Sequence, residues 1–373
     1  MKRILLIALI AIGNSVIGQE KQPVFPIVEE AQEIEWYRQQ WKLWKDDAMN
    51  GSKNENAWYN YYSATRALRN TVEQNEKKEF YDLCHSISVE MLEKFPESFE
   101  ANYVALWDQG LSNTDPKYLW KAYKISPNDA RLYDELLIRY EIEQKSTERK
   151  EMAEKMVSNN YLAASVLNWG YNLLSELDQN AIVLSAGDND TYALWLNQFG
   201  MGYREDVHVL NIHMAQIPEY REKLFTKMGI PNLSQEGITL DKIIEHVMSN
   251  SGDLDVHIAS SAYGYIQNAA LTENLYLTGL SYLHAEESID NLSLIRRNFE
   301  KRYALDYLTV KFSSHRMDEI AENFHLLYVT PLVKLYHMYT FSEEKEKVEE
   351  VKRILLSITS NTTMEQEILN LLK

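Results

Sequence analysis

The stretch AIVLSAGDNDTYALW, residues 181–195, decides the fold of the middle of this chain. It opens with the apolar run Ala181–Leu184, which predicts a buried strand, and the segment after Thr191 has the apolar periodicity of a helix. Between the two, Gly187 introduces a pair of aspartates around an asparagine. In α/β proteins a strand-to-helix turn of this kind is where functional loops usually lie. The stretch therefore predicts an α/β unit with its candidate site in the turn.

Three further stretches predict strands, and amphipathic segments stand between them. The strand candidates are residues 206–214, 253–261 and 274–284, and the candidate helices between them lie within 191–199 and 218–249. Strands that alternate with helices indicate right-handed crossovers and a mainly parallel sheet.

Helical periodicity covers both flanks of this unit. Residues 27–175 are helical nearly throughout. Near the other end, residues 316–339 predict a long helix bent at Pro331, which forms a hairpin with a helix over 342–358. The expected fold class is therefore mostly α with a central α/β unit, in which helical hairpins flank a small, mainly parallel three-layer sheet.

Two junctions in the first half resemble degenerate tetratricopeptide repeats. Pro96 and Pro127 each follow a predicted helix, and they stand 31 residues apart, close to the roughly 34-residue period of that repeat. Repeats of this kind usually bind proteins or serve as scaffolds. The same part of the chain holds most of the tryptophans, which suit either packing between helices or an aromatic platform for sugar rings; they are Trp36, Trp41, Trp44, Trp58, Trp107 and Trp120.

The first eighteen residues have the pattern of a secretory signal peptide. Lys2 and Arg3 precede the apolar run Ile4–Ile12, and the small residue Gly18 stands before Gln19. The alternative is an uncleaved N-terminal anchor helix. The predicted organisation is a signal peptide over 1–18, a helical-repeat domain over 19–178, an α/β domain over 179–290 and helical hairpins over 291–373.

Composition narrows the class of partner and the compartment. The formal net charge is −17 and the chain has no basic block, which argues against nucleic acid or an anionic membrane surface as partner. No later segment has eighteen consecutive apolar residues, so we expect no transmembrane segment in the mature chain. Cys84 is the single cysteine, so no intramolecular disulfide forms, and its helical position predicts a buried structural thiol. We expect an exported protein, periplasmic or extracellular.

The turn GDNDT permits two interpretations. In the first, Asp188 and Asp190 hold a divalent metal, because carboxylate oxygens spaced by one residue can converge on a hard cation. In the second, the turn is structural: Asp190 caps a helix that starts at Thr191, Asp188 or Asn189 bonds back across the turn, and Gly187 permits the bend. We expect the structural interpretation, with no cofactor, and keep a divalent cation as the alternative.

The histidines carry weaker signals. His208 and His213 lie on one predicted strand, five residues apart, so their side chains should face opposite sides. Asp255 and His257 share a face of another strand, where an Asp–His pair could support a base. No Gly-x-Ser-x-Gly motif, phosphate loop or His-Glu-x-x-His motif accompanies them.

Residues 187–214, GDNDTYALWLNQFGMGYREDVHVLNIHM, resemble the signature of the soluble part of the protein O-mannosyltransferase-like membrane proteins, a family of unknown function. The resemblance keeps its order over roughly 180–373, and its matching positions are Gly187–Thr191, Leu194, Trp195, Gln198, Arg204, Asp206, Val207, Asn211, Leu277, Gly279, Leu280, Tyr282, Asp290–Leu292 and Phe299. In that family glycosyl transfer would reside in a multi-span membrane region, which this sequence does not show. The resemblance therefore implies the fold and the signature, without transferase activity. The local tract 204–206 suggests that Arg204 pairs with Asp188 or Asp190 at the same sheet edge as a conformational clamp.

The functional expectation has two forms. The first is an exported interaction or scaffold protein of the cell envelope, non-catalytic, which binds a protein or glycan partner. The alternative is a glycan-related or sugar-nucleotide-dependent enzyme that uses the GDNDT turn with a divalent metal. The candidate ligand-binding residues are Asp188, Asn189, Asp190, Thr191, Trp195, Arg204 and Asn211.

Overall fold

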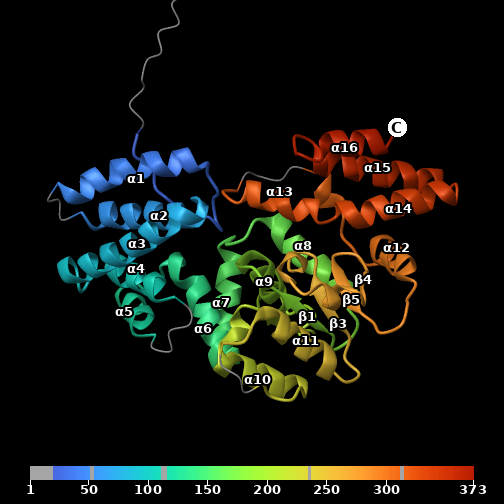
Figure 1. Cartoon of the computed structure of the whole chain (residues 1–373), viewed down its shortest axis with the longest axis horizontal. Coiled ribbons are helices and arrows are strands. Elements are labelled where there is room, and N and C mark those ends of the chain that lie inside the picture. Colours follow the sequence, from blue (N-terminus) through green and yellow to red (C-terminus); the bar gives the residue numbers. More distant parts are fainter. Residues whose placement is uncertain (1–19, 51–53, 111–115, 234–236, 311–314) are drawn as a thin grey trace, which may run out of the picture. The chain divides into compact units, whose positions relative to one another are not determined.

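The structure, a computed structural model, consists mostly of helices around one small sheet (Figure 1). It describes residues 20–50, 54–110, 116–233, 237–310 and 315–373. The expected signal peptide, residues 1–18, lies outside the described residues. The chain divides into two compact units: unit 1 contains Gln32–Val104 with the residues up to Phe25, and unit 2 contains Pro26–Ala31 and Ala105–Lys373.

Unit 1 is built from consecutive antiparallel helices. Helix α2 (Glu55–Thr71) packs against both α1 (Ile34–Met49) and α3 (Gln74–Lys94), and α4 (Phe99–Gln109) begins in this unit. Asn54 caps the start of α2, because its side chain accepts a hydrogen bond from the Ala57 amide at 3.4 Å. Since α2 is covered on both sides, it is buried along most of its length.

The tryptophans of the helical part pack between helices. Trp58 is fully buried and Trp44 is buried to 7% exposure. The other four, Trp36, Trp41, Trp107 and Trp120, are half-buried. This agrees with the packing interpretation, since a sugar platform needs an open ring face.

Along the chain, unit 2 contains one helical hairpin before the sheet and another after it. Helices α6 and α7 form one hairpin, and α14 and α15 form another. The long helix expected over 316–339 is in fact two helices, because Pro331 lies in the first turn of α14, where its missing N–H is tolerated. In chain order, the α-helices of unit 2 that precede the first strand or follow the last one are α5 (Lys117–Ile125), α6 (Tyr133–Glu143), α7 (Ser146–Ser158), α8 (Ala164–Glu176), α12 (Asn291–Lys301), α13 (Asp318–Leu326), α14 (Val329–Phe341), α15 (Lys345–Thr359) and α16 (Glu365–Leu371). Across the described parts of the chain, none of the helices combines the length and the apolarity that a membrane crossing requires.

The sheet described in unit 2 has the strand order β2-β1-β3-β5-β4. The three strands expected to be parallel are parallel, with β1 (Ile182–Ser185) between β2 (His208–Asn211) and β3 (Val256–Ala259). The expected fourth strand, 274–284, is instead two antiparallel strands, β4 (Leu275–Leu277) and β5 (Ser281–His284). The chain reverses between them at Gly279, whose φ of +156° few other residues adopt. The sheet is therefore mixed.

The connection after β1 leads to β2 on one side of it, and the connection after β2 leads back past β1 to β3 on its other side. Helix α9 (Asp188–Trp195) links β1 to β2, and helices α10 (Pro218–Met228) and α11 (Leu240–Asn250) link β2 to β3. Because β1 lies between its two neighbours, right-handed crossovers place α9 and the pair α10–α11 on opposite faces of the sheet. The point of reversal is outside the carboxyl ends of β1 and β3, which is where open α/β sheets usually bind ligands.

Candidate functional site at the carboxyl edge of the sheet

The GDNDT turn joins β1 directly to α9. The helix begins at Asp188 with Gly187 as its N-cap, so the expectation that Asp190 caps a helix starting at Thr191 is wrong. Asp190 instead lies in the first turn and reaches back, where its carboxylate accepts a hydrogen bond from the Ala186 amide at 3.2 Å. A carboxylate in the first turn also suits the positive end of the helix dipole.

The Asp190 carboxylate is buried and fully engaged. The side chain is 2% exposed, and it accepts two more hydrogen bonds, from the Thr191 amide at 2.8 Å and the Ser261 hydroxyl at 2.6 Å. Burial raises the pKa of Asp190, and these three hydrogen bonds act to lower it. Ser261 follows β3, so its bond ties the loops after β1 and β3 together. At this edge of the sheet the Asp190 carboxylate therefore bonds to the protein's own groups.

Thr191 and Asn211 continue this network towards β2. The Thr191 hydroxyl donates to the Gly187 carbonyl at 2.7 Å, and the Asn211 amide group donates to the Thr191 Oγ1 at 2.8 Å. On its other side, the Asn211 Oδ1 accepts from the His213 and Met214 amides at 2.9 and 3.0 Å. Both side chains thus hold loop backbone in place.

The remaining candidates in the turn differ in exposure. Asp188 is exposed and Asn189 is half-buried. The Asn189 amide group donates to the Val28 carbonyl at 2.9 Å, which attaches the segment Pro26–Ala31 to the turn. Trp195 is 1% exposed and belongs to the core.

The two metal candidates lie in different environments. Asp188 is exposed to solvent, near His213. Partial burial lowers the pKa of His213, and the negative charge of Asp188 acts to raise it. Asp190 points into the network described above. Within the described ranges, no three His, Cys, Asp or Glu side chains form a group that could hold a metal ion.

Arg204 lies at the opposite end of the strands from the GDNDT turn. The expected pairing with Asp188 or Asp190 is wrong, because Arg204 forms a two-bond ion pair with Asp206, with both N–O distances 2.8 Å. Its guanidinium also donates to the carbonyls of Leu174, Leu177 and Asp178 at the end of α8. Hydrogen bonding to Arg204 lowers the pKa of Asp206 to about 2. Arg204 is therefore a C-terminal cap of α8, because cations stabilise the free carbonyls at a helix end.

A second buried polar cluster, centred on Glu176, escaped the sequence interpretation. Glu176 ends α8 and is 2% exposed. Its carboxylate accepts hydrogen bonds from the Ser281 and Tyr303 hydroxyls and, at 2.8 Å, from the Leu280 amide. The Ser281 hydroxyl is also 2.8 Å from the His257 Nδ1, so His257 joins this cluster, not a pair with Asp255.

The sequence contains a signal for this cluster. Glu176 is the one acidic residue of α8, a helix of otherwise apolar and neutral polar residues, which argues for a buried partner. The structure adds Gly279 to this cluster, because a Cβ at this position would overlap with the Tyr303 hydroxyl and the Glu176 carboxylate. Sequence alone does not pair these residues because about a hundred positions separate Glu176 from Gly279.

Glu176 and His257 have opposite effects on stability as pH changes. Burial raises the pKa of Glu176 to about 7, so from its ordinary value of 4.5 up to 7 the folded protein keeps a proton that the unfolded chain has lost. This contribution to stability falls as pH rises. Burial lowers the pKa of His257 to about 4, so the unfolded chain binds a proton below 6.5 that the folded ring does not. That contribution falls as pH falls, and the two largely offset each other in the wild type.

The variant Glu176→Gln separates the two effects. We expect the wild-type free energy of unfolding, minus that of Glu176→Gln, to fall by roughly 3 kcal/mol between pH 4.5 and pH 7. The reason is that the neutral amide imitates the protonated carboxyl but not the buried carboxylate. Urea denaturation at a series of pH values measures the difference, and a difference independent of pH contradicts the prediction.

Comparison with known proteins identifies one similar segment. A family model described as TMEM260-associated domain 2 matches residues 166–231, which run from α8 to the end of α10. No curated protein and no solved structure matches the chain significantly. The matched segment contains the GDNDT turn, Arg204 and Asn211, so it supports the resemblance over that part of the chain, and beyond residue 231 the resemblance stays a prediction. Over 166–231, the sequence is similar to TMEM260-associated domain 2.

Proposed function

We propose that this protein is an exported interaction protein of the cell envelope, periplasmic or extracellular, which binds a protein or glycan partner without catalysing a reaction. The observation that carries the proposal is the engagement of Asp190, whose carboxylate is buried and bonded to Ala186, Thr191 and Ser261. A catalytic or metal-binding carboxylate needs a face open to its substrate or ion. The hydrogen bonds of Asp190 within the sheet edge support a structural role for the turn.

A surface for the partner is available in unit 1. On α3, Tyr81 is 61% exposed and Val89 is 43% exposed, two helical turns further on. Residues at this spacing lie on one helix face, so they present apolar surface in the same direction. Helical hairpins of this kind commonly bind partners through such faces.

The enzymatic alternative is tested by thermal melting of the wild type and Asp188→Asn with Mn²⁺, Mg²⁺, Ca²⁺ and sugar nucleotides. We expect each addition to change the melting temperature by less than about 1 °C, because a ligand stabilises only the state that binds it. An increase of about 5 °C or more that disappears in Asp188→Asn would support the enzyme and overturn the proposal.

The interaction itself is tested by pull-down from envelope extract. We expect the partner to bind wild type and Asp188→Asn equally, and to be lost with the double variant Tyr81→Ser/Val89→Ser. The matched control is Phe341→Ser, which removes an aromatic side chain that is 93% exposed in unit 2 and should leave binding unchanged. Loss of the partner with Asp188→Asn, or with Phe341→Ser, contradicts the assignment of the partner to this face.

A further inference from the structure

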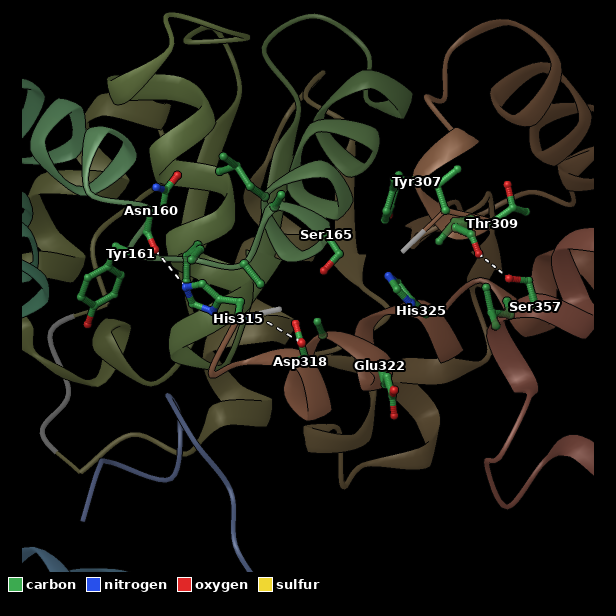
Figure 2. A pocket seen from close by; sticks show the side chains of 18 of the residues that line it. Asn160, Tyr161, Ser165, Tyr307, Thr309, His315, Asp318, Glu322, His325 and Ser357 are labelled. Carbon is green, nitrogen blue, oxygen red and sulfur yellow. Dashed lines mark hydrogen bonds between the residues drawn. The ribbon is translucent and has the colours of Figure 1, made fainter. Parts of the chain in front are cut away.

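Unit 2 contains a cavity of about 640 Å³ whose lining includes none of the five residues of the GDNDT turn. Its walls come from the end of α7, the start of α8, the turn around Tyr307, helix α13 and the end of α15 (Figure 2). A volume of this size suits a small molecule. The nature of the lining side chains decides which chemical class fits.

The inner wall of the cavity is apolar. Leu162, Leu196, Leu308 and Ile358 line it, and each is at most 5% exposed. Tyr307 lies among them, and its hydroxyl donates to the Tyr328 hydroxyl at 2.9 Å. An occupant that lies against this part of the lining therefore needs an apolar body, because the leucine and isoleucine side chains have no hydrogen-bonding groups.

Two hydroxyl groups of the lining are left as acceptors for an occupant. Ser357 donates its proton to the Leu308 carbonyl at 2.9 Å, and Thr362 donates to the Thr359 carbonyl at 2.7 Å. Each hydroxyl has one proton, so what it still offers an occupant is an oxygen lone pair. The His315 Nε2, 3.0 Å from the Asn160 carbonyl, is likewise already engaged (Figure 2).

The charge of the lining is negative. Asp318 and Glu322 stand one turn apart on α13, and both are exposed at the cavity. Among the lining residues that the structure describes there is no Lys or Arg. Asp318 accepts one hydrogen bond, from the His315 amide at 3.1 Å, which leaves carboxylate oxygens on both residues for an occupant.

His325 occupies the same face of α13, one turn beyond Glu322, and its ring lies 5.6 Å from that of Tyr307. Its Nε2 atom is buried and makes no hydrogen bond within the described residues. Burial lowers the pKa of His325, so the ring is neutral near pH 7 and adds no positive charge to the cavity.

From this lining we infer that the cavity binds a small organic ammonium ion with an apolar body. The ammonium group donates to Glu322 and Asp318, and the apolar body lies against Leu162, Leu196 and Ile358. An anion is disfavoured by the two carboxylates, and a sugar is disfavoured because it has no apolar body to lie against the leucine and isoleucine wall. The inference goes beyond the proposed function, which concerns unit 1 and the GDNDT turn, so either can fail without the other.

The test uses n-hexylammonium as the probe, with 1-hexanol, hexanoate and mannose as matched comparisons, by isothermal titration calorimetry with the full chain. We expect hexylammonium to bind at least tenfold more tightly than hexanol, and hexanoate and mannose not to bind. Added salt should weaken hexylammonium binding, because the carboxylates at the cavity are exposed. Hexanol that binds as tightly as hexylammonium, preferential binding of mannose, or no binding of hexylammonium at millimolar concentration would each overturn the inference.

Variants locate the site on the structure. Glu322→Gln keeps the size of the side chain and removes its charge, and we expect it to weaken hexylammonium binding about tenfold, equivalent to 1.4 kcal/mol. Glu319→Gln makes the same change on the same helix outside the cavity lining and should leave binding unchanged. Ala164→Trp, at an exposed position of the lining, should abolish binding by filling the space. Equal effects of Glu322→Gln and Glu319→Gln, or full binding by Ala164→Trp, contradict the location.

Discussion

Replacement of Gly279 by alanine is expected to lower the free energy of unfolding by about 4 kcal/mol. Two costs contribute. The backbone φ of +156° strains any residue that carries a Cβ. The added methyl group also overlaps with the Tyr303 hydroxyl and the Glu176 carboxylate, both of which are held by the buried cluster. Urea or thermal denaturation measures the loss.

Three further variants separate these costs. Gly264→Ala adds a methyl group in open space without φ strain, and its stability should equal that of the wild type within about 0.5 kcal/mol. Gly252→Ala adds strain alone, because its φ is +61° and nothing lies within 4 Å, so it should cost about 1 kcal/mol. In Gly279→Ala/Tyr303→Phe the clashing hydroxyl is absent, and the double variant should be more stable than the sum of its single effects predicts. Additive effects would contradict the steric explanation.

Asp190→Ala is expected to destabilise the protein by a similar amount, about 4 kcal/mol. The change removes the acceptor of three hydrogen bonds and leaves the Ala186 and Thr191 amides and the Ser261 hydroxyl without their partner in the sheet edge. Buried donors that lose their acceptor each cost about 1–3 kcal/mol. Chemical denaturation at pH 7 measures the effect.

The matched control is Asp188→Ala, two residues earlier in the same helical turn. Asp188 is exposed, so its loss should cost no more than about 1 kcal/mol, the typical contribution of an acidic side chain to the positive end of a helix. Equal destabilisation by the two variants would contradict the structural role of Asp190. The contrast also distinguishes a folding clamp from a site, because a binding carboxylate is usually dispensable for stability.

Local patterns were sufficient to predict many elements of the fold. The strands β1, β2 and β3 and the helices between them follow from apolar runs and periodicity. The start of α9 was predicted at Thr191, but the helix begins at Asp188. An Asp in the first turn that accepts a hydrogen bond from an earlier amide has the same sequence pattern as an N-cap. The division of 274–284 into two strands depends on Gly279, whose conformation follows from a cluster of residues distant in sequence.

The pairing of polar side chains was less predictable. Arg204 and Asp190 both flank strands, yet one lies at the amino end of the sheet and the other at the carboxyl end, so their proximity in sequence was misleading. The cavity beside α13 left no motif, because its lining comes from several helices and each contributes ordinary residues.

By itself, the sequence determined the class of this protein: helical hairpins around a small α/β unit, with GDNDT as the turn between β1 and α9. Periodicity and turn chemistry are local properties, so they can be read from neighbouring residues. Only the tertiary structure decided that Asp190 bonds to Ser261, that Glu176 meets Ser281 and Tyr303, and that Asp318 and Glu322 line a cavity. The physical reason is that burial and hydrogen bonding depend on which distant segments pack together, and that choice is made by the whole chain.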